Sequence, residues 1–346
     1  MKTLADFNLK AKRVLVRCDF NVPLSDKGAI LDDFRIRASL PTINYLLKNR
    51  ARVILMSHLA KPGGKVKEEF RLTAIQEKLL EYLDVSIVKA PDCVGPEIEK
   101  WTKEMQEGEI LLLENLRFHK EEETNGEDFA RALSKLGDIY INDAFAVCHR
   151  EHASIVGVPK YLASAAGFLL EKEIKILSQL TKNPRTPSVA IVGGAKVETK
   201  VGLLNSLSQK VDFVLIGGLI QKELKGKKIS LAYPEKIVEP VDQIGGGKDI
   251  GLKTRELFQE KITLAKTIFF NGPLGFIEKK EFSKGTERIL RAISQSRAFS
   301  IIGGGETVEF AAKLGLLDKF SYVSTGGGAM IAFLAGEKLP GLSALK

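Results

Sequence analysis

The sequence predicts an α/β protein of two domains, each built on a parallel sheet with helices on both faces. Three observations point to this fold class. Short apolar, β-branched runs alternate with helical patterns through most of the chain. The 346 residues are about twice the length of an ordinary domain. Between the halves, residues 169–182 have apolar residues at helical spacing and no turn residue, which predicts a rigid connecting helix.

The predicted elements follow one another in regular alternation. In the first half, strand-like runs occur at residues 13–20, 52–57, 85–89, 109–117 and 138–144. Helical patterns lie between them at 38–48, 73–83 and 127–136. In the second half, strands are expected at 189–192, 213–216, 267–270, 299–302 and 322–324. This order favours parallel sheets, in which ligands bind beyond the carboxyl ends of the strands.

Composition and charge exclude several classes of protein. No apolar run approaches the roughly 18 residues of a membrane span. The three cysteines are far apart and form no CxxC pair, so we expect a cytoplasmic protein in a reducing compartment. Residues 1–170 carry 25 basic and 25 acidic residues, whereas residues 171–346 carry 27 and 18, which supplies the whole net charge of +9. Solvated helix faces account for this basic half better than nucleic acid does, because aromatic residues do not interleave with its lysines.

The stretch at residues 188–200 predicts a site for a phosphate chain. An apolar strand stops at Gly193-Gly194, and Lys196 and Lys200 follow. If residues 195–209 form a helix, its first amide groups favour an anion and both lysines lie on one helical face. Close packing of a helix on a sheet would also explain the two glycines. However, four further predicted strands of this half end in turns that contain glycine, which favours a phosphate cradle. These turns are Gly217-Gly218, Asn271-Gly272-Pro273, Gly303-Gly304-Gly305 and Gly326-Gly327-Gly328.

In the first half the corresponding positions carry charged side chains. The residues are Arg17, Asp19, Asn21, His58, Lys61, Arg117, His149 and Arg150, with Arg35 in the first crossover. Any one of them could belong to a surface ion pair. Together they predict a pocket for a small, multiply charged anion, because guanidinium groups bind phosphate and carboxylate in a bidentate manner. The sequence contains no Walker A motif and no dinucleotide-binding fingerprint, and it offers no third ligand for a zinc site at His149 and His152.

At the level of motifs the chain resembles the phosphoglycerate kinase family. The resemblance rests on segments in family order, among them 16–23 (VRCDFNVP), 57–59 (SHL), 114–118 (ENLRF), 142–145 (NDAF), 193–196 (GGAK), 271–273 (NGP) and 324–328 (STGGG). It implies reversible phosphoryl transfer from 1,3-bisphosphoglycerate to Mg·ADP, giving 3-phosphoglycerate and Mg·ATP in glycolysis and gluconeogenesis. It also implies Rossmann-like domains, residues 1–168 with the tail 337–346 and residues 183–336, which close about the helix at 169–182 in a monomer without nucleic acid or membrane partners.

The resemblance also assigns roles to residues. The glycerate ligand would be bound by Asp19, Phe20, Asn21, Arg35, His58, Leu59, Ala60, Lys61, Arg117 and Arg150. The nucleotide would be bound by Gly194, Lys200, Asn271, Glu278, Gly304, Gly305, Glu306 and Thr307. Arg35, Lys196 and Lys200 would be catalytic, and Glu306 would hold Mg²⁺.

The chain departs from the family pattern in four respects. Ala60 and Lys61 stand where the family has glycine and arginine, and Glu306 replaces an aspartate. The nucleotide domain is several dozen residues shorter than usual around residues 219–248. We therefore expect residues 221–247 to be a mobile connection between two neighbouring strands, beside a shallow base site. A non-catalytic homologue that only binds anions and nucleotide remains an alternative.

Overall fold

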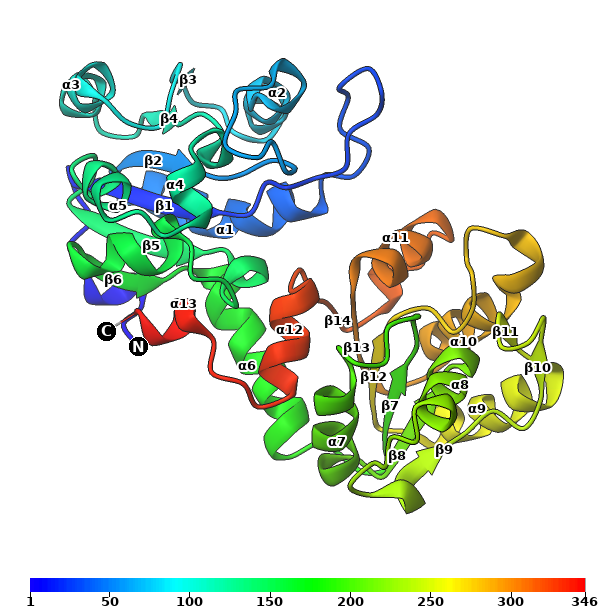
Figure 1. Cartoon of the computed structure of the whole chain (residues 1–346). Helices are drawn as coiled ribbons and strands as arrows, with labels where there is room; N and C mark the ends of the chain where they lie inside the picture. Colours follow the sequence, from blue (N-terminus) through cyan, green and yellow to red (C-terminus); the bar gives the residue numbers. More distant parts are fainter. Residues whose placement is uncertain (346) are drawn as a thin grey trace. The chain divides into compact units, whose positions relative to one another are not determined.

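The computed structural model describes residues 1–345, which form two compact units (Figure 1). Unit 1 comprises Met1–Ile174 and the tail from Lys338 onward. Unit 2 comprises Lys175–Glu337. The helix α6, Phe168–Lys182, therefore contributes residues to both units.

Unit 1 is built on a six-stranded parallel sheet in the order β3-β4-β2-β1-β5-β6. Its strands are β1 (Arg13–Cys18), β2 (Arg52–Met56), β3 (Ile87–Lys89), β4 (Ile110–Leu112), β5 (Ile139–Asp143) and β6 (Ala163–Ala166). In β1 every residue from Val14 to Cys18 is buried. Burial on both faces is typical of a central parallel strand, and Arg17 is the one charged residue in this buried run.

The helices of unit 1 pack around this sheet. They are α1 (Phe34–Lys48), α2 (Thr73–Tyr82), α3 (Pro96–Glu104), α4 (Lys120–Glu123), α5 (Glu127–Ser134) and α13 (Pro340–Ser343). Ile36, Ile43 and Leu46 lie on one face of α1 at helical spacing and are fully buried in the core. Burial of this face against the sheet explains why the segment is a helix despite Pro41 in its second turn.

Unit 2 repeats the architecture with the strand order β14-β13-β12-β7-β8-β9. Its strands are β7 (Ser188–Val192), β8 (Phe213–Ile216), β9 (Ile237–Val238), β12 (Thr267–Asn271), β13 (Phe299–Gly303) and β14 (Tyr322–Val323). Its helices are α7 (Val201–Lys210), α8 (Gly218–Gly226), α9 (Leu252–Leu264), α10 (Lys284–Gln295), α11 (Gly305–Lys313) and α12 (Gly327–Leu334). The core joins sheet residues such as Phe270 to Phe258 of α9 and Ile289 of α10.

The structure confirms the predicted fold class, and each of the ten predicted strand runs contains a strand. Two edge strands were not predicted. In β6 the sequence Ala-Ser-Ala-Ala has little β propensity, and the strand exists because it pairs with β5. The strand β9 has only two residues, too few for any periodic pattern.

The helix predicted to begin at Ala195 begins instead at Val201, so that prediction was wrong at its start. Residues 193–200 form bends and a turn. Val197 is fully buried in this turn, and its backbone nitrogen donates to Glu223 Oε2 over 3.1 Å. The hydrogen bond to Glu223 of α8 holds residues 197–200 in a turn, and α7 begins only after it. Consequently Lys196 and Lys200 do not share a helical face: Lys196 is exposed and Lys200 is buried.

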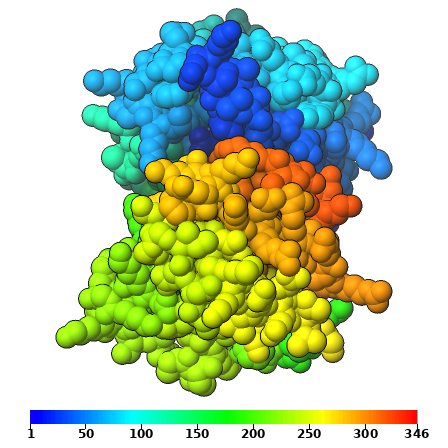
Figure 2. Space-filling view, turned by 90° about the vertical axis from the view of Figure 1, so that its right-hand side faces the viewer, coloured from blue at the N-terminus to red at the C-terminus, as the bar shows by residue number. Residues whose placement is uncertain are grey.

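Residues 221–247 were expected to be a mobile connection between two neighbouring strands; the neighbouring strands were wrong, and the mobility stays a prediction. The segment contains most of α8, the strand β9 and β10 (Gln243–Ile244), which forms an antiparallel hairpin with β11 (Asp249–Ile250). In Figure 2 these residues, light green to yellow, are part of a continuous surface of unit 2. The flanking strands are not neighbours, because β7 lies between β8 and β12.

Short helical turns complete the described chain. They are η1 (Leu4–Asp6), η2 (Glu68–Phe70), η3 (Leu116–Phe118), η4 (Phe145–Val147), η5 (Ala153–Gly157), η6 (Val158–Lys160), η7 (Pro234–Lys236), η8 (Lys280–Phe282) and η9 (Leu317–Lys319). Among residues 1–345, no helix has both the length and the apolar character needed to cross a membrane.

Candidate active site

Unit 1 gathers charged side chains at the carboxyl edge of its sheet. Arg117, His58 and Asp19 follow β4, β2 and β1, which are adjacent strands, and Arg150 follows β5. In the first turn of α1, Arg35 Nη1 donates to Asp19 Oδ2 over 2.7 Å. The sheet therefore brings together residues from four separate parts of the sequence, as predicted from their positions at strand ends.

His58 lies among these cations and is almost fully buried. Its Nδ1 is 3.2 Å from Arg17 Nη2 and 3.9 Å from Asp19 Oδ1. Burial lowers the pKa of His58 well below its usual value, and the charges of four neighbouring arginines lower it further. The imidazole is therefore neutral at pH 7. The positive charge of the arginines that surround it favours a bound anion.

Behind His58 lies a fully buried network of Arg17, Ser154 and Glu122. Arg17 Nε donates to Ser154 Oγ over 2.8 Å, and Ser154 Oγ donates to Glu122 Oε1 over 2.6 Å. Glu122 Oε1 also lies 3.8 Å from Arg17 Nη2, so the buried guanidinium is compensated by a carboxylate. Glu122 is the middle residue of three glutamates, and nothing in the sequence distinguishes it from its neighbours.

The loop after β2 is held by its backbone at Ala60. The nitrogen of Ala60 donates to Asn21 Oδ1 over 2.8 Å, and its carbonyl oxygen accepts from Arg117 Nη1 over 2.7 Å. Ala60 has φ 57°, a left-handed conformation that favours glycine. This explains physically why the family pattern has glycine at this position, as expected from the resemblance.

Arg117 retains hydrogen-bonding capacity inside the site. Its side chain is 2% exposed, yet among residues 1–345 its Nη2 has no hydrogen-bond partner. Burial lowers the pKa of Arg117, and the positive charges of Arg150 and Arg17 add to this effect. A buried, incompletely satisfied guanidinium is costly in a free protein, and an anionic ligand would relieve that cost.

The other residues predicted on this side differ in exposure. Phe20 and Leu59 are buried, and the nitrogen of Phe20 donates to Ser57 Oγ over 2.8 Å. Arg150 is half-buried, whereas Lys61 is exposed. Phe20 and Leu59 therefore support the loops on which the polar residues lie.

In unit 2 the glycine-containing turns all lie at one edge of the sheet. The strands β14, β13, β12, β7 and β8 are consecutive neighbours, and a glycine-containing turn follows each of them. Hydrogen bonds join three of the turns. The nitrogen of Gly194 donates to Pro273 O over 2.7 Å, and that of Gly272 donates to Thr307 Oγ1 over 2.9 Å. The predicted phosphate cradle is thus a contiguous set of backbone turns.

The glycines at the centre of this edge are required by close backbone contact. A Cβ atom on Gly193 would overlap the carbonyl oxygen of Pro273. Gly272 has φ 81°, and a Cβ there would overlap the carbonyl of Gly193 and the Nζ of Lys200. Close packing therefore explains why these two positions are glycine. This explanation is compatible with ligand binding at the same edge of the sheet.

Lys200 is the charged group at the centre of this cradle. Lys200 is only 8% exposed. Its Nζ donates to the carbonyl oxygen of Gly193 and to Asn271 Oδ1, the latter over 3.2 Å. Burial lowers the pKa of Lys200 to about 8, against a smaller opposing effect of Glu306. A buried ammonium surrounded by backbone turns can bind a phosphoryl oxygen directly.

The remaining residues predicted for the nucleotide lie along α11 and the loop after β12. Gly304 has φ 91° and precedes α11, and Thr307 is fully buried in the first turn of that helix. Gly305 and Glu306 are exposed in the same turn, and Glu278 is exposed in the loop. Mg²⁺ is usually held by one or two carboxylates together with phosphate oxygens, so the exposed Glu306 carboxylate in the first turn of α11 fits that ion.

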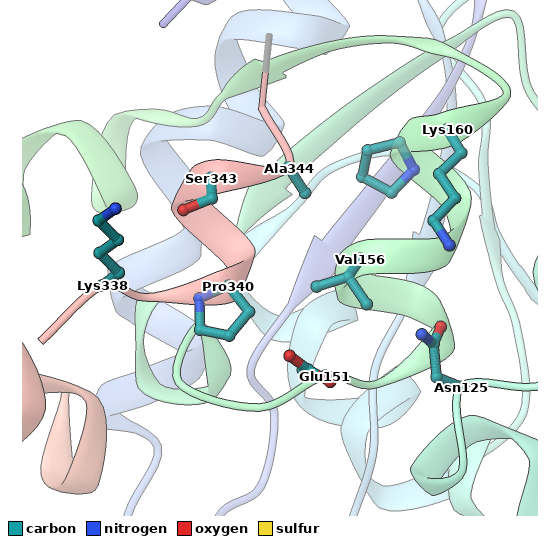
Figure 3. Close-up of a pocket in the computed structure, with 9 residues that line it drawn as sticks. Asn125, Glu151, Val156, Lys160, Lys338, Pro340, Ser343 and Ala344 are labelled. Carbon is teal, nitrogen blue, oxygen red and sulfur yellow. The ribbon is translucent and has the colours of Figure 1, made fainter.

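A separate pocket in unit 1 contains none of the predicted site residues (Figure 3). Tail residues such as Lys338 and Pro340 form one side of it. Val156 and Lys160, from η5 and η6, form the other side. Glu151 also lines the pocket and follows Arg150 directly in sequence.

Comparisons with known proteins agree over nearly the whole chain. The family model described as "Phosphoglycerate kinase" matches residues 4–232 and 226–337. The phosphoglycerate kinase of Pelotomaculum thermopropionicum is 41% identical over 388 residues, covering 99% of this chain and 98% of the relative. That of Moorella thermoacetica is 43% identical over 387 residues, with 99% and 98% coverage.

Solved structures give the same result. The phosphoglycerate kinase of Pyrococcus horikoshii OT3 has a TM-score of 0.86 and 34% identity, covering 100% of this chain and 98% of its own. That of Coxiella burnetii has a TM-score of 0.83 and 34% identity, with 99% and 98% coverage. The 388 positions aligned with the Pelotomaculum protein exceed the 346 residues of this chain by 42.

Proposed function

The chain belongs to the phosphoglycerate kinase family, and from this membership we infer how its two groups of site residues divide the reaction. The protein is a phosphoglycerate kinase of glycolysis. It transfers the acyl phosphate of 1,3-bisphosphoglycerate to Mg·ADP and runs in both directions. Family membership favours this enzyme over the alternative, a non-catalytic homologue that only binds anions and nucleotide.

The glycerate ligand is bound by unit 1 in this proposal. Arg117 offers a buried nitrogen without a hydrogen-bond partner in the described chain, which is the donor that a phosphate or carboxylate oxygen needs. Arg35 and Arg150 are partly exposed and complete the positive surroundings. His58 remains neutral, so it offers the ligand a hydrogen bond and no positive charge.

The nucleotide phosphates are bound by unit 2. Backbone nitrogens of Gly304 and Gly305 lie at the carboxyl edge of the sheet, where α11 begins. Gly194 lies at the same edge in the turn after β7, and its own nitrogen donates to Pro273 O, so it contributes to the shape of the cradle. Asn271 and Thr307 hold the turns in register, since each hydrogen-bonds to a neighbouring turn. Glu278 is the carboxylate that we assign to the ribose.

The transfer itself requires positioning and positive charge, because little covalent chemistry falls to the protein. We assign Lys200 to the phosphoryl oxygens that become more negative in the transition state, together with Arg35 and the exposed Lys196. The attacking oxygen of ADP is already anionic, so no general base is needed in the direction of ATP formation. The substrates are assigned to different units, so domain closure stays part of the proposal.

The family uses nucleotide as its magnesium complex. In this chain Glu306 would hold the ion, which when bound neutralises charge on the nucleotide phosphates. We also infer that the missing positions fall at residues 219–248, because the two family matches meet at residues 226–232. Monomeric state and cytoplasmic location remain predictions, which sedimentation and cell fractionation test.

The observation that carries this function is the match to phosphoglycerate kinases over 99% of the chain. The decisive experiment measures consumption of Mg·ATP that depends on 3-phosphoglycerate, with the purified protein. Turnover that requires both substrates is expected, and omission of 3-phosphoglycerate provides the control. ATP hydrolysis that is indifferent to 3-phosphoglycerate would contradict the proposal.

A further inference from the structure

At the ends of β3 and β4, unit 1 brings together an aspartate, a cysteine and a histidine to which the reaction gives no role. The two strands are parallel neighbours, so the segments that follow them lie side by side. Asp92 and Cys93 follow β3, and His119 follows β4 and η3. A carboxylate oxygen of Asp92, the Sγ of Cys93 and a ring nitrogen of His119 all lie within 4.8 Å of one another.

These groups are held in place by their surroundings. His119 Nε2 lies 2.6 Å from Asp92 Oδ1, and the backbone nitrogen of Cys93 donates to the same oxygen over 2.6 Å. The ring of His119 stacks on Phe129 of α5, with centroids 4.9 Å apart and an interplanar angle of 26°. The stacking fixes the plane of the imidazole, and Nε2 already faces the Asp92 carboxylate.

The combination of sulfur, nitrogen and oxygen donors selects a type of cation. Mg²⁺ and Ca²⁺ prefer ligands that are all oxygen, whereas Zn²⁺ binds thiolate, imidazole and carboxylate. Bonds of about 2.3 Å to sulfur and about 2.0–2.1 Å to nitrogen and oxygen place neighbouring ligands of a tetrahedral zinc ion roughly 3.3–3.7 Å apart. The present spacing, 2.6 Å between His119 and Asp92 and up to 4.8 Å overall, needs only local side-chain adjustment.

The cluster also has an open side. Cys93 is fully buried, but the side chains of Asp92 and His119 are 51% and 28% exposed. A cation can reach the thiol from that side and keep a water molecule as its fourth ligand. On binding, the Cys93 thiol loses its proton to solvent, and its hydrogen bond to Glu114 O, now 2.9 Å long, is exchanged for a bond to the metal. The proton between His119 Nε2 and Asp92 Oδ1 leaves as well, so that the neutral imidazole binds through Nε2 with its remaining proton on Nδ1.

We propose that Asp92, Cys93 and His119 form a binding site for Zn²⁺ in unit 1. The site is independent of the magnesium site assigned to Glu306, which lies in unit 2. Its ligands differ in type from those of a magnesium site, so the two sites are distinguished by the metal used as a probe. The binding site would link the segment after β3 to the segment that carries Arg117 and His119.

Cobalt(II) tests the proposal on the full-length protein, because it replaces zinc and is visible by absorption. Titration at neutral pH should produce tetrahedral d–d bands and a near-ultraviolet charge-transfer band from thiolate to cobalt. Added Zn²⁺ should abolish both. All three cysteines lie in residues 1–150, so cobalt bound at Glu306 cannot give the charge-transfer band.

Three variants and one control localise the band. Cys93→Ser keeps a hydroxyl donor for Glu114 O and should lose the band, whereas Cys148→Ser, at a buried cysteine elsewhere in unit 1, should keep it. Asp92→Asn and His119→Gln should weaken cobalt binding at least about tenfold. The proposal is overturned if the wild-type protein gives no thiolate band at excess cobalt, or if the band persists in folded Cys93→Ser. Circular dichroism of each variant establishes that it is folded.

Discussion

The ammonium group of Lys200 donates a hydrogen bond to Asn271 Oδ1 over 3.2 Å and so connects the turn after β7 to the end of β12. Because the same group also donates to Gly193 O, the lysine is fixed in position before any ligand arrives. Buried charge held by backbone turns is the form of preorganisation that stabilises a phosphoryl transition state. Lys200 therefore differs from the exposed Lys196, although the spacing in sequence suggested that the two are equivalent.

We expect Lys200→Ala to lower kcat by roughly 10²-fold or more, since one preorganised charge is lost at the transition state. Lys200→Met retains most of the side-chain volume and should show the same loss, which separates the effect of charge from that of a cavity. Steady-state kinetics measure both variants. Lys210→Met, at the other end of α7, is the control and should leave kcat unchanged; wild-type turnover in Lys200→Met would remove the residue from the mechanism.

Nucleotide binding should raise the pKa of Lys200. Burial has lowered this pKa to about 8, and phosphate oxygens would favour the charged form again. At pH 8 about half of the lysine is neutral, so binding of ADP should take up as much as about half a proton. Calorimetric titration in two buffers with different ionisation enthalpies measures this uptake. It should vanish at pH 6 and in Lys200→Met, and uptake that persists in that variant would assign the proton to another group.

Ala60→Gly should raise the free energy of unfolding by about 0.5–1 kcal/mol. A left-handed conformation costs a non-glycine residue about 1–2 kcal/mol, and the greater entropy of glycine in the unfolded chain offsets part of the gain. The backbone contacts to Asn21 and Arg117 do not involve the side chain, so activity should remain. Denaturant unfolding tests the prediction. Ala38→Gly, inside α1, should do the opposite, and equal destabilisation by both substitutions would contradict the argument.

Asp143 should make unit 1 less stable as the pH rises from 4 to 7. Burial raises the pKa of this carboxyl to about 7, although the backbone nitrogens of Leu169 and Leu170 donate to it. Near pH 4 the unfolded chain begins to lose a proton that the folded chain retains, so the contribution is complete below that pH and lost on passing pH 7.

Asp143→Asn removes this titration and keeps an oxygen that accepts from both backbone nitrogens. Between pH 5 and pH 8 the variant should therefore gain about 1–3 kcal/mol relative to wild type. The measurement is the difference between the two unfolding free energies at each pH, in which the other titrating groups cancel. A difference independent of pH would show that Asp143 is ionised in the folded protein.

The ten strands predicted from the sequence, and the charged residues and glycines at their ends, follow from local patterns, whereas β6 and β9 form by pairing with a neighbouring strand and were missed. Arg17 and Asp19 were recognised because charge at the end of an apolar run is unusual. The partners of Arg17 were not recognised, because Glu122 and Ser154 are 105 and 137 positions away and look like ordinary surface residues. The conformation of residues 195–200 also depends on a distant contact, from Val197 to Glu223, which no local propensity reveals.

The last prediction concerns Glu306, in the first turn of α11. A glutamate is one methylene longer than the aspartate of the family pattern. The carboxylate of Glu306 is nevertheless exposed, and the residue follows Gly304 and Gly305 directly in sequence. One carboxylate is enough for a Mg²⁺ ion that also binds phosphate oxygens. Glu306→Gln should lower magnesium-dependent turnover at least about tenfold while leaving binding of metal-free ADP within about twofold. Excess magnesium should restore part of the turnover.

Glu309→Gln is the matched control, because Glu309 lies on the same helix, is exposed and forms an ion pair with Lys313 at 2.7 Å. Loss of that ion pair should cost at most about 1 kcal/mol of stability and should not change the magnesium dependence. A negative charge near the start of a helix also stabilises the helix by interacting with its dipole. Glu306→Gln would therefore reduce stability even if Glu306 had no role in metal binding. In that case turnover and metal-free ADP binding would fall together, and added magnesium would restore neither. A magnesium requirement that rises in Glu306→Gln and is unchanged in Glu309→Gln therefore separates a metal ligand from a helix charge.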